Sequence, residues 1–183
     1  MILNPEGGPE RTHPLTWAYI RKFAKLLRER KAFKKFFDER RDAFYSMYAV
    51  GEYTFAPHKL AWMDISATVK ATVISAPSGK TIPIPEHTVI FVAATSEDEA
   101  HYLAAALNSD AVGMVVEGYI VDNHLSTHPV ENIRLPKYDA RDQLHRDLAE
   151  LSRQAHTAAS RGDDSAIRNI EATINMRVVG LWQ

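Results

Sequence analysis

Apolar side chains recur at spacings of three and four near the start of the chain, from about residue 14 to residue 27. This period places them on one face of an α-helix, and Pro14 suits its first turn, where a missing backbone N–H costs nothing. Three phenylalanines predict a second short helix over residues 31–37. The residues before Pro14 show no period and several Gly and Pro, so residues 1–13 are predicted to be a flexible lead-in. The apolar positions of the first helix are Trp17, Ile20, Phe23, Ala24 and Leu27.

The middle of the chain alternates between short β-branched, apolar runs and segments rich in proline or glycine. Residues 59–66, 68–76 and 88–94 have the composition and length of strands, and a hairpin or bend joins the first two. Residues 77–87 contain three prolines and a glycine and predict a loop or an edge segment. A fourth short strand is expected over residues 132–135.

Helix signals follow the third of these strands. Ser96 and Glu99 have the spacing of a capping box, at the start of a helix that runs to about residue 107. Residues 111–121 are left open between helix and strand, because their position favours a helix and their composition favours a strand. Residues 122–129 are polar and predict a loop.

The last third of the chain predicts two more helices. Leucines recur at helical spacing between residues 140 and 160, and Gly162 suits the position just past that helix. Isoleucines recur from residue 167 to residue 178, with Asp163 or Asp164 as the N-cap. Two helices joined by so short a turn form an antiparallel hairpin that packs on another element.

These elements predict an α+β fold. We expect a small β-sheet covered by helices, with an N-terminal basic helix and a C-terminal antiparallel helical hairpin. The α+β domain spans residues 14–139, and the hairpin of residues 140–183 packs on it. An all-helical bundle or a doubly wound parallel sheet would contradict this prediction.

Composition excludes several classes of protein. The chain of 183 residues has no cysteine, which rules out disulfides, thiolate zinc sites and cysteine nucleophiles. No apolar run approaches the roughly 20 residues needed to cross a bilayer, and the polar first residues are unlike a signal peptide. We therefore expect a cytoplasmic protein with no membrane partner.

The charge is unevenly distributed. The net charge is −1, yet ten basic residues lie between Tyr19 and Arg41, opposed by only three acidic ones. Acidic residues collect in the helices after Ser96 and Asp139. A basic cluster of this kind is either a solvated helix face or a surface for phosphate groups.

Motifs for catalysis or metal binding are missing. His124 and His128 lie four apart, but in a predicted loop, and no H-E-x-x-H spacing occurs among the eight histidines. No serine lies in a G-x-S-x-G pattern. The Ser78–Lys80 triplet lacks the rest of a phosphate-binding loop and fits a turn. We expect no metal site and no catalytic residue in this chain.

Several stretches, in this order and spacing, resemble the C-terminal specificity region of TaqI-like adenine-N6 DNA methyltransferases, including enzymes that fuse restriction and modification. They are residues 44–62 (FYSMYAVGEYTFAPHKLAW), 84–91 (IPEHTVIF), 99–109 (EAHYLAAALNS), 132–139 (NIRLPKYD), 144–156 (LHRDLAELSRQAH) and 170–181 (IEATINMRVVGL). The resemblance covers nearly all of the chain from about Leu15 onward. The family commonly has Ile-Asp where this chain has Ile174-Asn175, a position expected on a helix surface.

The resemblance implies a DNA-recognition domain that is not itself catalytic. In this family the catalytic domain precedes the specificity region, which grips double-stranded DNA and reads the major groove while the catalytic domain flips out an adenine. The chain has neither the Asn/Asp-Pro-Pro-aromatic loop nor the glycine-containing turn of that catalytic domain. S-adenosylmethionine is therefore expected in a catalytic methyltransferase domain or subunit that partners this chain.

The candidate DNA contacts fall into two kinds. Phosphate contacts are expected from Arg21, Lys22, Lys25, Arg28, Lys34, Lys35, Arg40 and Arg41. Base contacts are expected from three loops, which contain Tyr53, Thr54, His58 and Lys59; Ser78, Lys80 and Thr81; and Asn123, His124, Ser126, Thr127 and His128. The alternative role for the nearby aromatics is core packing, which is favoured for Phe55 and Trp62 and left open for Tyr53.

Two other functions compete with DNA recognition. The chain could be a nuclease fragment of the same restriction system, although it lacks a P-D pair, and neither Glu86 nor Glu131 has a lysine two residues on. It could instead be an interaction scaffold that docks a methyltransferase or nuclease partner through its terminal hairpin.

Overall fold

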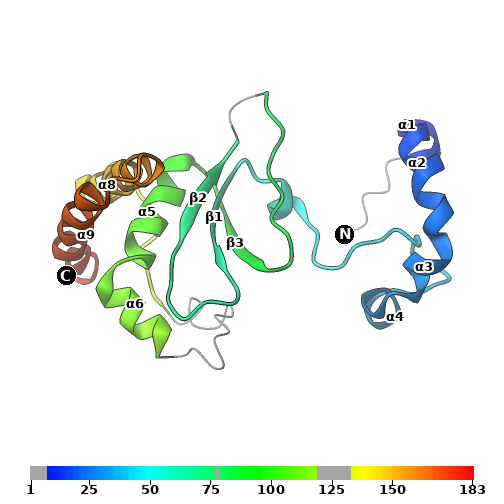
Figure 1. Cartoon of the computed structure of the whole chain (residues 1–183), viewed down its shortest axis with the longest axis horizontal. Coiled ribbons are helices and arrows are strands. Elements are labelled where there is room, and N and C mark those ends of the chain that lie inside the picture. Colours follow the sequence, from blue (N-terminus) through cyan, green and yellow to red (C-terminus); the bar gives the residue numbers. More distant parts are fainter. Residues whose placement is uncertain (1–7, 77–78, 119–132) are drawn as a thin grey trace. The chain divides into compact units, whose positions relative to one another are not determined.

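The computed structural model describes residues 8–76, 79–118 and 133–183 (Figure 1). The chain divides into two compact units, an N-terminal unit, Met1–Glu52, and a C-terminal unit, Tyr53–Gln183. None of the helices in the described ranges is long and apolar enough to cross a membrane. The predicted α+β fold is confirmed.

The N-terminal unit is a series of short helices. They are α1 (Gly8–Thr12), α2 (Pro14–Ile20), η1 (Arg21–Phe23), α3 (Ala24–Glu29) and α4 (Lys31–Phe36). Pro14 begins α2 as expected, but a 3₁₀ turn interrupts the single helix predicted over residues 14–27. α1 lies within the predicted lead-in, where the sequence showed no helical period.

Aromatic rings and one arginine hold this unit together. Phe33 and Phe44 are buried, and the ring of Trp17 lies 5.5 Å from that of Phe44. The Arg30 guanidinium donates to the carbonyl oxygens of Leu27 (2.9 Å), Phe44 (3.2 Å) and Ser46 (2.9 Å). Arg30 thereby fixes the segment after α4 against the bend between α3 and α4.

A three-stranded antiparallel sheet forms the centre of the C-terminal unit. Its strands are β1 (His58–Met63), β2 (Thr72–Ser75) and β3 (Val89–Ala94), in the order β2-β1-β3. The connection between β1 and β2 is longer than the predicted hairpin or bend. Next to the start of β2, the backbone N–H and C=O of Ala71 bond to the side chain of Asn108 at 2.7 and 2.8 Å.

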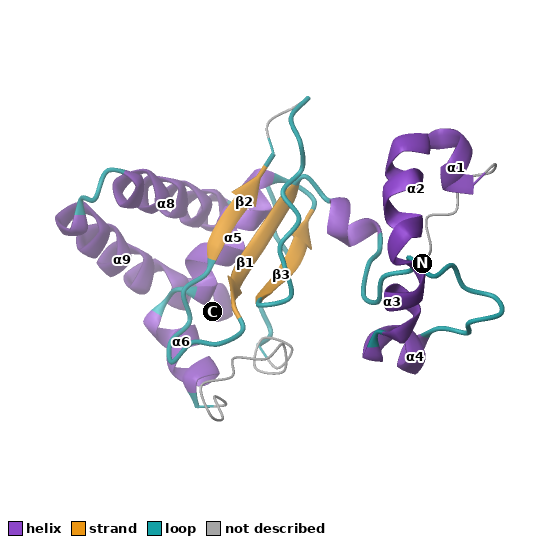
Figure 2. Cartoon of the chain, turned by 45° about the vertical axis from the view of Figure 1, so that its right-hand side comes forward, coloured by secondary structure: helices purple, strands orange, loops and turns teal. Residues whose placement is uncertain are grey.

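One face of the sheet is covered by helices (Figure 2). α5 (Glu97–Leu107) and α6 (Asp110–Glu117) pack their buried side chains against Leu60 and Trp62 of β1. Residues 111–121, for which both helix and strand were left open, are therefore helical as far as residue 117. Ser96 caps α5 as predicted, while the Glu99 carboxylate accepts from the backbone N–H of Thr95 rather than of Ser96.

The predicted helical hairpin is present at the C-terminus. It consists of α8 (Gln143–Ser160) and α9 (Asp164–Val178), followed by η3 (Val179–Trp182). Gly162 has a φ of 70°, which glycine adopts without strain, and Asp163 is the N-cap of α9. The hairpin packs on α5 through a second apolar cluster that includes Tyr102, Leu148 and Val178.

The prediction of a fourth strand over residues 132–135 is wrong. Residues 133–138 belong to no helix or strand and pair with no strand in the described part of the chain, and Asn132 lies outside it. Side chains satisfy the backbone here: Trp182 Nε1 donates to Arg134 O at 2.9 Å, and the Tyr102 hydroxyl donates to Pro136 O at 2.8 Å. The segment packs under the helices through Ile133, Leu135 and Tyr138.

Asn175, at the position that departs from the family pattern, has a specific partner. Its Oδ1 accepts from the backbone N–H of Asp110 at 2.9 Å, and its Nδ2 donates to the Asp110 carboxylate at 2.7 Å. The position is therefore not a free helix surface. It joins α9 to the start of α6.

Candidate nucleic-acid interface

The eight cationic side chains expected to contact phosphates are all exposed on the N-terminal unit. η1 carries Arg21 and Lys22, α3 carries Lys25 and Arg28, α4 carries Lys34 and Lys35, and Arg40 and Arg41 follow α4. Exposed cations so close in sequence are what a protein needs to replace the counterions of a phosphate backbone.

Two of these cations have weak ion-pair partners. The Arg28 guanidinium lies 3.7 Å from the Glu39 carboxylate, and Arg41 lies 3.7 Å from Asp38. Exposed ion pairs of this kind contribute little to stability, so a phosphate can compete with either carboxylate. Arg30 differs because all its hydrogen bonds go to backbone carbonyls, and it is a structural residue.

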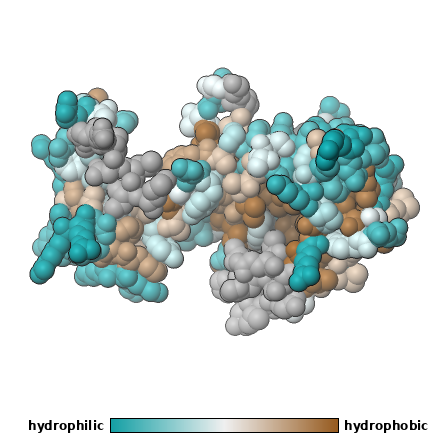
Figure 3. Space-filling model, turned by 180° about the vertical axis from the view of Figure 1, so that it is seen from behind, coloured by the Kyte–Doolittle hydropathy of each residue, from teal (hydrophilic) through white to brown (hydrophobic). Residues whose placement is uncertain are grey.

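Exposed aromatic and aliphatic side chains occur on the same unit as these cations, and hydrophilic and hydrophobic surface adjoin each other in Figure 3. Tyr48 is exposed and its ring stacks on Phe36, with centroids 3.7 Å apart and planes 11° apart. Leu15, Tyr19 and Leu26 are also exposed, by 86%, 63% and 64%. The apolar period that begins at Trp17 does not include these exposed apolar side chains, so the sequence did not single them out.

The first loop predicted to contact bases has some side chains exposed to solvent and others buried in the core. η2 (Glu52–Phe55) exposes Tyr53 and Phe55 but buries Thr54. His58 is half-buried, with Nδ1 3.1 Å from the Ser75 hydroxyl. Core packing, which was favoured for Phe55 and Trp62, holds for Trp62 alone.

Lys59 lies entirely inside the protein, although it was predicted to read bases. Its side chain is fully buried, and its ammonium donates to Ala56 O at 2.5 Å and to Pro83 O at 3.2 Å. Burial lowers the pKa of this ammonium. In this position Lys59 cannot contact a base, because neighbouring loops cover it.

The other two predicted loops are only partly described. Lys80 and Thr81 are exposed. Ser78 lies outside the described residues, and so does the whole third set: Asn123, His124, Ser126, Thr127 and His128.

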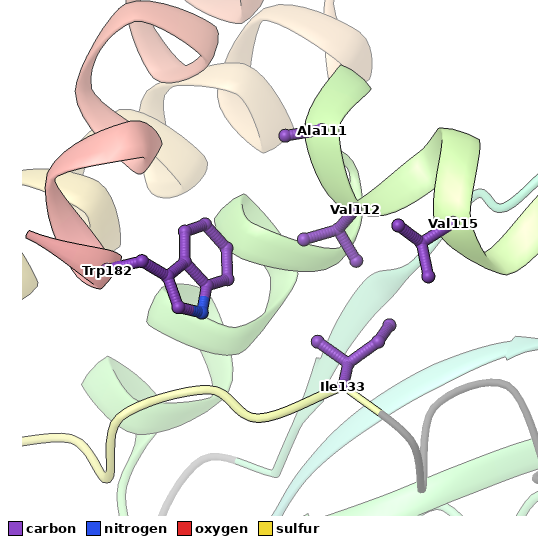
Figure 4. Close-up of a pocket in the computed structure, with 5 residues that line it drawn as sticks. All are labelled: Ala111, Val112, Val115, Ile133 and Trp182. Atoms are coloured by element: carbon purple, nitrogen blue, oxygen red, sulfur yellow. The ribbon is translucent and has the colours of Figure 1, made fainter.

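The C-terminal unit also has an apolar hollow of about 330 Å³, beside α6 (Figure 4). Its lining consists of Ala111, Val112, Val115, Ile133 and Trp182. It offers hydrophobic contact but no charged or catalytic group among these residues.

Histidines of the helical layer have structural partners. His101 Nδ1 lies 3.1 Å from the Ser152 hydroxyl, and His145 Nδ1 accepts from the backbone N–H of Asp139 at 3.0 Å. Burial, together with the neighbouring His156 and Arg153, lowers the pKa of His101 to about 4. Within the described ranges no cluster of His, Asp and Glu could hold a metal ion.

Comparison with known proteins adds no assignment. No protein-family model matches this chain, and no curated protein matches it.

Proposed function

We propose that this chain is the sequence-specific DNA-binding, or target-recognition, domain of an adenine-N6 DNA methyltransferase of a restriction-modification system. One observation carries the proposal: every cation that the sequence suggested for phosphate contact is exposed, while Arg30, left out of that set, is used within the fold. The resemblance of the sequence to the specificity region of TaqI-like DNA methyltransferases supports it as well.

Phosphate contacts and base contacts are assigned to different units of the chain. The cations of the N-terminal unit contact phosphates, which gives affinity without sequence preference. The exposed or half-buried loop residues of the C-terminal unit, Tyr53, His58, Lys80 and Thr81, contact base edges. Residues 123–128 remain candidates for the same role. Methyl transfer and S-adenosylmethionine belong to a catalytic domain or subunit.

A selection from randomised duplexes tests this function. The 183-residue chain is incubated with a pool of duplexes that have a randomised centre, and bound duplexes are sequenced over several rounds. We expect one short motif to be enriched, and affinity for any duplex to fall as salt rises, by a logarithmic slope of about −0.9 per phosphate contact. Failure to bind duplex DNA at low salt would refute the proposal.

A second candidate function is an interaction scaffold. The exposed apolar side chains of Leu15, Tyr19 and Leu26 favour it, because exposed apolar surface can mark a protein interface. Replacing Leu15 and Leu26 by serine should then abolish co-purification with a methyltransferase partner and leave the salt dependence of DNA binding unchanged. If the double variant weakens duplex binding instead, Leu15 and Leu26 belong to the DNA interface.

A further inference from the structure

Lys59 is a buried cation for which the structure gives no carboxylate partner among the described residues. Its ammonium lies between two backbone carbonyl oxygens and is 5.9 Å from the centre of the Phe91 ring. A buried charge is costly unless it is hydrogen-bonded, and even a buried ion pair can often be replaced by hydrophobic residues without loss of stability. Stability alone therefore gives little reason for a lysine at this position.

The two carbonyls belong to different loops. Ala56 lies in residues 53–57, with Tyr53 and Thr54. Pro83 lies in residues 79–87, with Lys80 and Thr81. Both loops lie on the sheet face opposite α5, because Lys59 and Leu60 are adjacent on β1 and point to opposite faces. One side chain therefore ties two candidate reading loops to each other and to the central strand.

Phe91 extends this tie to an exposed aromatic. Its ring lies on the same face of the sheet, since Phe91 pairs with Ala61, two residues from Lys59. The ring of Tyr53 lies 5.8 Å from that of Phe91. The position of Tyr53 thus depends on the strand residue that also contacts the Lys59 ammonium.

We propose that Lys59 is a positioning residue for sequence recognition, which fixes residues 53–57 and 79–87 at one separation without contacting DNA. This inference rests on the proposed function. It differs from a purely structural role because removing the ammonium should relax sequence preference while leaving phosphate contacts intact.

Lys59→Met is the variant that tests it, since methionine keeps the length of the apolar stem and removes the donors. Leu60→Ala is the matched control: it weakens the same strand from the other face and touches neither loop. Amide ¹⁵N relaxation of residues 53–56, 80–82 and 84 reports on loop order in the full chain. Enrichment from the randomised duplex pool and the salt slope report on DNA.

We expect Lys59→Met to loosen both loops and to lower the enrichment of the preferred motif at least tenfold, with an unchanged salt slope. Leu60→Ala should keep both properties at temperatures where it is folded. Unchanged loop relaxation in Lys59→Met overturns the inference, and so does looser relaxation with unchanged enrichment. If Lys59→Met does not fold, Lys59→Arg takes its place as the test, because arginine retains hydrogen-bond donors. Both loops should stay ordered in Lys59→Arg, and loss of order in either loop would overturn the inference.

The relaxation data separate this inference from the proposed function. If the wild-type chain enriches no motif, the recognition function fails, and Lys59 has no recognition to position. Loosened loops in Lys59→Met would then show that Lys59 stabilises the two loops but has no role in recognition. If the wild type enriches a motif and Lys59→Met enriches it equally, only the positioning role is lost.

Discussion

The backbone N–H of Val73 donates a hydrogen bond to Nε2 of His156 at 3.0 Å, which joins the edge strand β2 to helix α8. Nε2 must be unprotonated to accept this bond, so Nδ1 carries the proton and donates to Ser152 O at 2.8 Å. The neutral imidazole therefore bridges two elements that are 83 residues apart in sequence.

Replacing His156 by leucine should destabilise the C-terminal unit by about 1–3 kcal/mol, because the N–H of Val73 loses its acceptor. The free energy of unfolding in urea measures this loss. Thr157→Ala, at the next position of α8 and facing solvent, is the control and should change the free energy by much less. A loss equal to that of the control would mean that water replaces the imidazole without cost.

His101 should make the stability of the chain depend on pH. Its pKa is about 4 in the folded protein and near 6.5 in the unfolded chain, so the unfolded state binds more protons between these values. The contribution is complete above about pH 6.5 and is lost as the pH falls towards 4, by a few kcal/mol in all.

Urea unfolding between pH 4 and pH 7 checks this prediction. His101→Gln should flatten the dependence over that window. His87→Gln removes an exposed histidine and should leave the dependence unchanged. A wild-type curve that is level from pH 7 to pH 4 would show that His101 titrates normally in the folded protein.

Neutralising the exposed cations of the N-terminal unit, one at a time, should lower the salt dependence of DNA binding. Neutralising Arg21, Lys25 or Lys34 with glutamine should weaken binding to every duplex alike and reduce the logarithmic salt slope by about 0.9 for each phosphate contact removed. Fluorescence anisotropy at several salt concentrations measures the slope. Arg168→Gln, on the exposed surface of α9, should leave it unchanged, and an equal effect there would mean that binding follows net charge only.

Loop residues should behave in the opposite way. Replacing Lys80 by glutamine, or Thr81 by valine, should cost about 1–3 kcal/mol on the preferred duplex and little on others, provided that the side chain reads a base. Competition between preferred and scrambled duplexes measures this difference. Equal losses on both duplexes would assign the residue to phosphate contact instead.

Neighbouring residues in the sequence were sufficient to predict several helix ends and the exposed cations of the N-terminal unit. The Ser96 cap, Gly162 and Asp163 act through backbone groups only a few residues away, so their effects can be predicted from adjacent residues. The exposed cations were predictable for a related reason, since charged side chains stay in water unless the fold supplies partners.

Only the tertiary structure decided which loop residues reach solvent and which segments pair. Thr54 and Lys59 have the polar composition of a loop that contacts bases, yet both are buried, and for Lys59 the distant residues 79–87 supply an acceptor, Pro83 O. Residues 133–135 have the composition of a strand, but the side chains of Tyr102 and Trp182 satisfy the backbone carbonyls of that region in place of a neighbouring strand. Burial and pairing depend on contacts between segments far apart in the chain, which the local pattern of apolar and polar residues does not specify.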